Sequence, residues 1–440
     1  MIVMKFGGSS VESAEAILRV AGIVQARAER RPVVVVSAMG KTTNRLLEAA
    51  NLAVSGQRDA ALAKVEELRA YHHAEADRFG AAATIDAHFQ ELSELVRGLA
   101  ILGELTPRSI DAVSSFGERL SSEIVAMALE ATHIDSRQVI ITDERHTQAG
   151  PLYAETNVKL SGVRWGAISV MGGFIGATRA GVTSTLGRGG SDFTASIVGA
   201  GIDAEEIQIW TDVDGMLSAD PTVIPGGRRV KSISFAEAAE LAYFGAKVLH
   251  PSTVLPAIEK NIPVLILNSR RPEVSGTRIT AEGPETKSPA KSIASKKNIT
   301  VVNIQSTRML MAHGFLRRIF EVFDRHETPV DMIATSEVSV SLTIDFTANL
   351  EVIARELREF SEVEIEDANA IVCLVGDNIR WQAGIAHRVF RALDPINVRM
   401  ISQGASLRNL SVVVAQKDLR EATERLHNEF FADADPEVFD

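Results

Sequence analysis

Short apolar segments that alternate with helical segments constrain the fold of this chain more than any other feature. Residues 2–6, 32–37, 167–171, 207–210 and 263–268 are mostly apolar and rich in β-branched side chains. The valine-rich segment 32–37 does not alternate with polar residues, as expected of a parallel strand covered on both faces. Helical patterns separate these apolar segments along the chain. This alternation predicts an α/β fold with a doubly wound, mainly parallel sheet.

Helical patterns and turn signals complete this first region. A strand is expected at 139–142, and a hairpin with its tip at 179–181 precedes an expected strand at 182–186. Ser10 or Ser13 is a candidate N-cap for the first helix. Helices are expected at 11–28, at 45–104 as two or three helices, and at 110–131, 192–201 and 235–249.

Composition excludes several classes of function. The length of 440 residues indicates two or three domains. The net charge of −11 argues against binding to nucleic acid or to an anionic membrane surface. We find no apolar run of membrane-spanning length and no signal-peptide pattern, so we expect a cytoplasmic protein. Cys373 is the single cysteine, which excludes an intramolecular disulfide, and no cluster has the spacing of a zinc site. We therefore expect no protein-bound metal.

The stretch 187–192 concentrates the groups of an anion site. It contains three glycines together with Arg188, Ser191 and Asp192. Glycine allows the backbone to approach a ligand closely, and the helix expected from residue 192 supplies amide groups. An arginine can bind a carboxylate or phosphate with two hydrogen bonds. A flexible surface loop is the alternative for this stretch taken alone.

A second glycine turn follows the first expected strand. Lys5 ends that strand, and Gly7, Gly8 and Ser9 lead into a helix. A strand, a glycine turn and a helix N-terminus together form a phosphate-binding arrangement. It is not a P-loop, because the lysine precedes the glycines. For Lys5 taken alone, a strand-edge lysine in solvent is the simpler interpretation.

Acidic side chains lie at other element ends. Glu118 opens an amphipathic helix, where it interacts either with the helix dipole or with a ligand ammonium group. Asp212 and Asp214 follow the strand at 207–210. They suit a site for a nucleotide with Mg²⁺, although an ordinary Asp-rich turn has the same composition.

The C-terminal part contains an approximate repeat. Residues 271–297 are rich in Pro, Gly, Ser, Thr and Lys and predict a linker, which we place at 286–298. Two copies of a βαββα pattern follow at 299–366 and 367–440, each typical of a small ferredoxin-like α+β domain. Exposed strand edges in such domains can pair with each other or with a second chain.

Several separated motifs together resemble the aspartate kinases of the amino acid kinase superfamily. The repeat is similar to the paired ACT domains of that family, which bind amino acids. The resemblance covers the whole chain and implies a catalytic domain at 1–285 and ACT domains at 299–366 and 367–440, without a homoserine dehydrogenase part. The matching stretches are residues 5–11, 116–121, 173–176, 186–194, 210–215 and 244–251.

The resemblance implies transfer of a phosphoryl group from ATP, with its Mg²⁺, to the side-chain carboxylate of L-aspartate. The product is 4-phospho-L-aspartate, the first step toward lysine, threonine and methionine. A carboxylate with a pKa of about 4 is already ionised at neutral pH and needs no general base. Positioning and positive electrostatics are then the main requirements.

Family resemblance also implies residue roles. Lys5 and Asp192 are the candidate catalytic residues, and Asp192 is also expected, with Glu118, to hold the aspartate ammonium group. The candidate substrate-binding residues are Thr43, Glu118, Phe174, Arg188 and Ser191. The candidate ATP-binding residues are Gly7, Gly8, Ser9, Ser37, Thr211, Asp212 and Lys247. The candidate effector residues in the first repeat are Met309, Gly314, Phe315, Val330, Asp331, Thr335, Ser336 and Glu337.

The implied partners are L-aspartate, an end-product effector such as lysine or threonine, and further copies of the chain in a homodimer or homotetramer joined through the ACT domains. The sequence departs from the family pattern at Leu217, Thr222 and Ala312. Two alternatives stay open at this point. One is a kinase for glutamate or a related acid, and the other is a non-catalytic amino-acid sensor.

Overall fold

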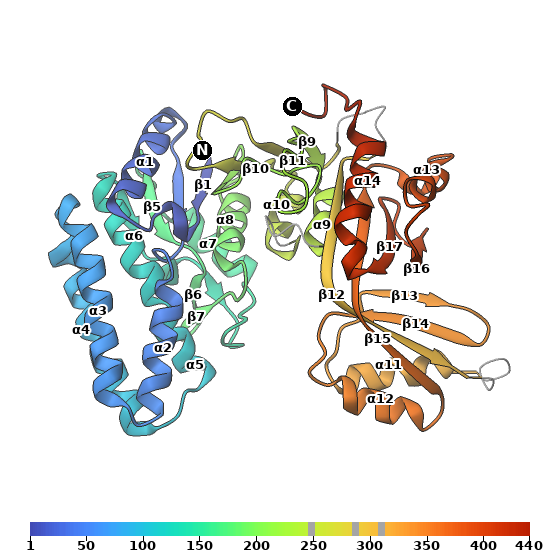
Figure 1. Cartoon of the computed structure of the whole chain (residues 1–440). Coiled ribbons are helices and arrows are strands. Elements are labelled where there is room, and N and C mark those ends of the chain that lie inside the picture. Colours follow the sequence, from blue (N-terminus) through green and yellow to red (C-terminus); the bar gives the residue numbers. More distant parts are fainter. Residues whose placement is uncertain (245–250, 284–289, 307–312) are drawn as a thin grey trace. The chain divides into compact units, whose positions relative to one another are not determined.

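The computed structural model describes residues 1–244, 251–283, 290–306 and 313–440. These residues form two compact units (Figure 1). The first unit consists of Met1–Met216 with Val248–Glu282, and the second of Leu217–Lys247 with Gly283–Asp440. Among the described residues, no helix has the length and apolar character needed to cross a membrane.

A mainly parallel sheet forms the centre of the first unit. Its strands within this unit follow the order β3-β5-β2-β1-β8-β10-β11, and β11 is antiparallel to β10 while the other neighbours are parallel. The prediction of a doubly wound, mainly parallel sheet is confirmed. The strands are β1 (Val3–Phe6), β2 (Val33–Val36), β3 (Thr132–Ile134), β5 (Ser169–Gly172), β8 (Ile207–Thr211), β10 (Val264–Asn268) and β11 (Thr277–Thr280). A separate small sheet contains β4 (Ile141–Thr142), β6 (Ile175–Thr178) and β7 (Thr183–Thr185).

Helices cover both faces of the main sheet. Figure 1 shows the central strands with α1 and α6 on one side and α8 on the other. Three helices, α2, α3 and α4, account for the region 45–104, as predicted. The helices are α1 (Ala14–Gln25), α2 (Thr42–Val54), α3 (Arg58–Ala76), α4 (Ala82–Leu102), α5 (Pro107–Ser114), α6 (Phe116–Ala128), α7 (Tyr153–Ser161), α8 (Gly190–Gly201) and α10 (Leu255–Glu259).

The sequence prediction differs from the structure for the helices expected at 110–131 and at 11–28. The helix expected at 110–131 is divided into α5 and α6 at Ser115, whose hydroxyl donates to the carbonyl of Ala112 at 2.8 Å. A hydroxyl that bonds back to its own helix bends the backbone. The first helix begins later than expected, because Ser13 caps α1 by accepting a hydrogen bond from the amide of Ala16.

Alternation along β1 decides which residues face the site. Ile2, Met4 and Phe6 are buried in the core that α1, α2, α4 and α6 share. Successive strand residues point to opposite faces of a sheet. Val3 and Lys5 therefore face α8, and a Cβ added at Gly199 of α8 would lie 3.8 Å from Val3 Cγ2. The strand places a lysine on the face that carries the glycine-rich stretch.

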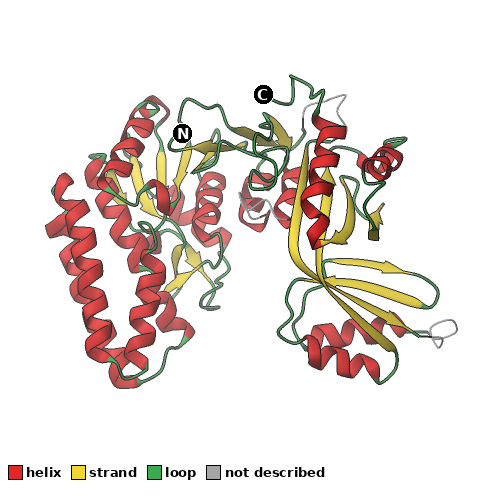
Figure 2. Ribbon diagram, viewed as in Figure 1, coloured by secondary structure: helices red, strands yellow, loops and turns green. Residues whose placement is uncertain are grey.

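The second unit is built on a six-stranded antiparallel sheet in the order β13-β14-β12-β15-β17-β16. Figure 2 shows β12 and β15 as its longest strands, and each has 14 residues. The strands of this unit are β9 (Ser232–Ser234), β12 (Ser292–Gln305), β13 (Met332–Thr335), β14 (Ser339–Ile344), β15 (Glu362–Val375), β16 (Val398–Gln403) and β17 (Asn409–Ala415). The helices are α9 (Phe235–Tyr243), α11 (Phe315–Arg325), α12 (Leu350–Arg358), α13 (Ile385–Ala392) and α14 (Leu419–Phe431).

The two repeats share their long strands. The first copy uses the later part of β12, and the second copy pairs its part of β15 with residues 292–296 of β12. The expected linker at 286–298 is therefore wrong for residues 292–298, which belong to β12. Polar composition suggested a linker, but Ile293 and Ala294 are buried and the backbone pairs with β15. Likewise, the boundary between 366 and 367 falls inside β15.

Residues 217–247 group with the C-terminal repeats rather than with the expected domain 1–285. The reason lies in α9. Its Glu237 forms an ion pair of 3.1 Å with Lys291, and both side chains are almost fully buried. Its Glu240 accepts hydrogen bonds from Ser406 Oγ at 2.5 Å and Asn409 Nδ2 at 2.6 Å. These polar contacts connect α9 to both the start of β12 and the β16–β17 region.

Lys291→Met should destabilise the second unit by about 3 kcal/mol, because it leaves the buried carboxylate of Glu237 without its counter-ion. The measurement is the free energy of unfolding in urea. Lys260→Met is the control, since its pair with Asp203 is exposed (52% and 79%) and should contribute less than about 1 kcal/mol. Equal effects of the two substitutions would contradict the assignment.

Candidate active site

The carboxyl ends of four neighbouring strands meet at one edge of the main sheet. In register, Phe6 lies beside Val36 and Trp210, and Val36 lies beside Gly172. The turns after these strands are bonded together: the amide of Gly7 donates to the Trp210 carbonyl at 3.2 Å. In open α/β sheets, ligands bind at this edge. The edge brings together Phe6 and Trp210, which lie far apart in the sequence.

Lys5 is held at this edge and does not extend into solvent. Its Nζ lies 2.7 Å from Oδ1 of Asp192 on α8, and the two side chains are 12% and 15% exposed. A Cβ added at Gly7 would lie 3.8 Å from Lys5 Nζ, so the ammonium group lies over the glycine turn. The simpler interpretation of Lys5 as a solvated lysine is wrong. The structure joins the two glycine-containing stretches through one ion pair.

Glycines allow the N-terminus of α8 to pack closely on the turn between β5 and β6. A Cβ at Gly190 would lie 2.7 Å from Phe174 Cδ2, and one at Gly173 would lie 2.6 Å from Ser191 Cβ. Gly187 and Gly189 have φ values of 76° and 72°, which favour glycine. The helix begins at Gly190, two residues before the predicted start. Its first amide groups and dipole favour an anion nearby.

Phe174 has a strained backbone at the same turn. Its φ is +65°, an uncommon value for a residue with a Cβ. Two hydrogen bonds fix this conformation: the Phe174 amide donates to Thr194 Oγ1 at 3.0 Å, and its carbonyl accepts from the Leu186 amide at 2.9 Å. Backbone strain of this kind concentrates at functional sites.

A cavity of about 280 Å³ lies at this position. It brings together both candidate catalytic residues, four of the five candidate substrate-binding residues and one candidate ATP-binding residue. Three glycines from the stretch 187–192 complete its wall. The lining residues are Lys5, Ser37, Thr43, Glu118, Phe174, Gly187, Gly189, Gly190, Ser191 and Asp192.

Glu118 is a buried carboxyl group in the cavity wall. Burial raises its pKa from 4.5 to about 8, and the hydrogen bond from the Ala38 amide to Oε1 (3.1 Å) only partly opposes this shift. Its Oε2 is buried without a hydrogen-bond partner in the described structure. Gly117 permits the close packing, since a Cβ there would lie 2.6 Å from Ala38 Cβ. A buried acceptor of this kind suits a cationic ligand group.

Arg188 does not line the cavity, although its neighbours Gly187 and Gly189 do. Its side chain is exposed, and no described residue forms an ion pair with it. The candidate residues Gly7, Gly8 and Ser9 lie outside the cavity at the end of β1.

Thr211 and Asp212 lie along the same edge, at the end of β8. Thr211 Oγ1 donates to Asp212 Oδ1 at 3.2 Å, and Asp212 is exposed. Asp214 has other partners, because Asn268 and Arg271 bind its two oxygens. The described residues contain no cluster of three or more metal-ligating side chains. The candidate Lys247 lies outside the described residues.

Sequence reasoning missed Asp111, a fully buried carboxylate that fixes the chain before the glycine stretch. It accepts hydrogen bonds from His146 Nδ1 at 2.7 Å, from the Thr147 amide at 3.0 Å and from Thr185 Oγ1 at 2.5 Å. The Thr147 carbonyl in turn lies 3.1 Å from where a Cβ of Gly187 would be. Its position within a helical pattern gave no signal, because its partners come from distant loops.

The described candidate effector residues lie in the second unit, around β13 and at the start of α11. Asp331 precedes β13, whereas Thr335, Ser336 and Glu337 lie at the other end of this strand and are exposed. Gly314 caps α11 and Phe315 begins it. Val330 packs on the core of the first repeat. Met309 lies outside the described residues, as does Ala312.

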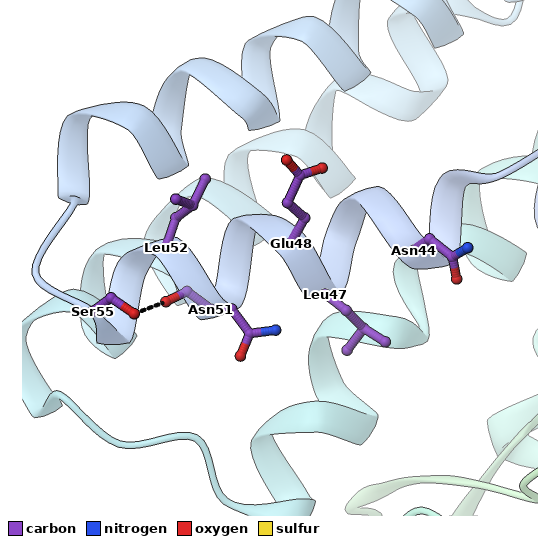
Figure 3. A pocket seen from close by; sticks show the side chains of 6 residues that line it. All are labelled: Asn44, Leu47, Glu48, Asn51, Leu52 and Ser55. Carbon is purple, nitrogen blue, oxygen red and sulfur yellow. Dashed lines mark hydrogen bonds between the residues drawn. The ribbon is translucent and has the colours of Figure 1, made fainter.

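A second, larger cavity of about 480 Å³ lies on one face of α2 (Figure 3). Six residues of this helix and its end line it: Asn44, Leu47, Glu48, Asn51, Leu52 and Ser55. Glu48 is the one ionisable group among them, and the hydrogen bond drawn in Figure 3 joins Ser55 Oγ to the Asn51 carbonyl at 2.7 Å. None of these six residues is cationic, whereas Lys5 lines the smaller cavity.

Glu118→Gln should make the protein more stable than the wild type, increasingly so from about pH 5 to about pH 8. In this window the folded chain keeps the Glu118 proton, since its pKa is about 8, whereas the unfolded carboxyl loses it above 4.5. The folded state then binds more protons, so its stability falls as pH rises. Urea unfolding at several pH values measures this difference. A difference independent of pH, or equal to that of the exposed control Glu94→Gln, would contradict the assignment.

Comparisons with known proteins identify the family. Residues 1–268 match the amino acid kinase family, and residues 372–430 match an ACT domain. The chain is 35% identical to lysine-sensitive aspartokinase 3 of Escherichia coli, covering 98% of this chain and 99% of that protein. It is 40% identical to chloroplastic aspartokinase 3 of Arabidopsis thaliana, and the match covers 98% of this chain and 81% of that protein.

Solved structures agree with this result. The crystal structure of E. coli aspartokinase III in complex with aspartate and ADP (R-state) matches with a TM-score of 0.83 at 35% sequence identity. The match covers 98% of this chain and 100% of that chain. The complex of the same enzyme with lysine and aspartate (T-state) also has a TM-score of 0.83, with coverage of 98% and 99% at 34% identity. With an amino acid kinase fold and ACT domains, and with full-length relatives of this similarity, the chain belongs to the aspartokinase family and is an aspartate kinase.

Proposed function

We propose that the cavity of about 280 Å³ binds L-aspartate and that ATP binds along the adjacent strand ends. The observation that carries this proposal is the meeting of Lys5, Glu118 and Asp192 in one cavity at the N-terminus of α8. An oxygen of the aspartate side chain attacks the γ-phosphorus of ATP. The bond from this phosphorus to the β-phosphate oxygen breaks, giving ADP and 4-phospho-L-aspartate. The complex of the E. coli relative with aspartate and ADP supports this pairing of ligands.

The site chemistry fits a reaction between two anions. The aspartate carboxylate is ionised at neutral pH and needs no base, but it is repelled by the phosphates. The Lys5 ammonium group and the α8 dipole supply positive charge at fixed positions, which lowers this repulsion in the transition state. Asp192 holds the Lys5 ammonium group at 2.7 Å and so keeps it directed at the cavity.

The groups around the cavity suit an α-amino acid. Glu118 and Asp192 lie in the wall and accept hydrogen bonds from the aspartate ammonium group, while Thr43, Phe174 and Ser191 shape the space. Binding of a cation to Glu118 favours its ionised form, so aspartate binding displaces the proton that burial retains there. Arg188 on the adjoining loop then binds the α-carboxylate, since it is exposed and close in sequence to the glycines of the wall.

For the nucleotide, the glycine turn at the end of β1 is the proposed phosphate site. Gly8 is packed closely: a Cβ would lie 2.8 Å from the Ala38 carbonyl oxygen, so backbone alone forms this wall. Gly7, Ser9 and Ser37 adjoin it, and Thr211, Asp212 and Lys247 are proposed to contact ATP. Mg²⁺ arrives on the phosphates, and the exposed carboxylate of Asp212 is the proposed group nearest to it.

We also propose that an end-product amino acid, lysine or threonine, regulates the enzyme through the first ACT domain. The support is the lysine complex of the E. coli relative and the acidic group Asp331 in the first repeat. Assembly of two or four chains through the ACT domains and a location in the cytoplasm stay predictions.

Lys5→Ala should lower kcat for ATP-dependent aspartyl hydroxamate formation by at least about a hundredfold, because the transferring phosphoryl group loses its cationic partner. The fold should be retained, which circular dichroism checks. Lys159→Ala on α7 is the matched control and should keep wild-type turnover. Near wild-type turnover in Lys5→Ala would defeat the assignment of Lys5.

Arg188→Ala should raise the KM for aspartate about tenfold or more while the KM for ATP changes little, because the α-carboxylate loses a bidentate partner. Arg179→Ala is a suitable control, since Arg179 lies in the nearby hairpin turn and pairs with Glu155. Equal increases in both KM values would contradict the role proposed for Arg188.

A further inference from the structure

Lys296 bridges two carboxylates of the first repeat. Its Nζ lies 2.7 Å from Asp331 Oδ1 and 2.8 Å from Asp345 Oδ2. The ammonium group also lies 5.7 Å from the centre of the Tyr243 ring. Asp331 is the residue that we expect to bind an effector ammonium group. In this structure, an ammonium group from the chain itself is bound there.

Asp331 retains capacity for a ligand. Its side chain is only 6% exposed, and its Oδ2 is buried without a hydrogen-bond partner in the described structure. Burial raises its pKa in spite of the contact with Lys296. Asp345, by contrast, is 39% exposed and holds Lys296 from the solvent side. Lys296 therefore has an alternative carboxylate partner if a ligand occupies Asp331.

The second repeat shows the same contact with its charges exchanged. The strand register shows which positions of β12 and β15 are equivalent. Ser292 pairs with Val375, and Glu362, the counterpart of Ser292, pairs with Gln305, the counterpart of Val375. The same relation places Glu366 at the position of Lys296, and the matching registers of β13 and β16 place Arg399 at the position of Asp331. Arg399 NH1 lies 2.9 Å from Glu366 Oε2.

The two copies therefore differ in which partner of the ion pair carries the positive charge. Both copies contain an ion pair at the same place, so the pair is part of the shared architecture. In the second copy, Arg399 stands at the position of Asp331, and its guanidinium group repels an ammonium group. In the first copy, Asp331 carries a carboxylate, and a ligand ammonium group can compete with Lys296 for it. Only the first copy offers an acidic partner at this position.

We propose that Lys296 is an internal competitor for the ammonium group of the effector and thereby sets the affinity of the first ACT domain. The proposal rests on the regulatory function proposed above and specifies its mechanism. The effector ammonium group binds Asp331, while Lys296 stays with Asp345. Each effector molecule that binds must therefore replace a charge-assisted contact of 2.7 Å. The protein therefore binds its effector more weakly than it would if Asp331 had no contact with Lys296.

Lys296→Met tests this proposal in the full-length enzyme, with L-lysine as the probe and L-threonine as a second probe. The Kd for L-lysine from isothermal titration calorimetry should fall about tenfold, the size of one charge-assisted contact that no longer needs replacement. Inhibition of the kinase reaction should shift to lower lysine concentration by the same factor. The control is Glu366→Gln, which removes the equivalent pair in the second copy and should leave the Kd unchanged.

Asp345→Asn gives a second test with the opposite sign. It removes the alternative partner of Lys296, so Lys296 binds Asp331 alone and the Kd for lysine should rise. An unchanged or higher Kd for both amino acids in a folded Lys296→Met variant would overturn the proposal, as would a folded variant that binds neither amino acid. If L-threonine alone shows the tenfold gain, the competition holds with threonine as the effector. Failure of the catalytic function is a separate result, since it appears as absent hydroxamate formation in the wild type.

Discussion

The ion pair between Lys5 and Asp192 is the contact on which the candidate active site depends. It joins the end of β1 to the start of α8 at 2.7 Å, with both side chains largely buried. The pair exists because alternate residues of β1 face opposite sides of the sheet, so that Lys5 shares a face with Val3 and α8. A shift of β1 by one residue would move Lys5 into the apolar core. Register in the sheet therefore determines where the positive charge lies that we propose for phosphoryl transfer.

Glycines are needed around this pair for steric reasons that differ from one position to the next. Gly173 and Gly190 let α8 approach the β5–β6 turn, whereas Gly117 lets Glu118 reach the Ala38 amide. The outcome is a small cavity with a buried acid and a paired lysine in its wall. Such a site can distinguish an amino acid from other anions, because it offers an acceptor for the ammonium group as well as positive charge for the phosphates.

The second unit contains an ion pair at the same position in each of its two repeats. Its two repeats share β12 and β15, so neither copy has a complete sheet without the other. The α9 helix, held by Lys291, Ser406 and Asn409, belongs to the same unit. Its Tyr243 lies near Lys296 and Asp331, the groups at which we propose effector competition.

The sequence by itself determined the parallel α/β sheet, the two glycine-containing stretches, the repeat and the family. These features are local, because strand composition, glycine turns and spacing are visible along the chain. It also named most residues of the cavity through the family motifs, although not Asp111, whose partners lie on distant loops. Other properties arise only when distant segments pack together. Burial raises the pKa of Glu118, Arg188 lies outside the cavity, and a polar stretch taken for a linker forms part of β12. The tertiary structure alone placed Lys296 on Asp331, because an ion pair between a strand and a distant turn leaves no pattern in the sequence.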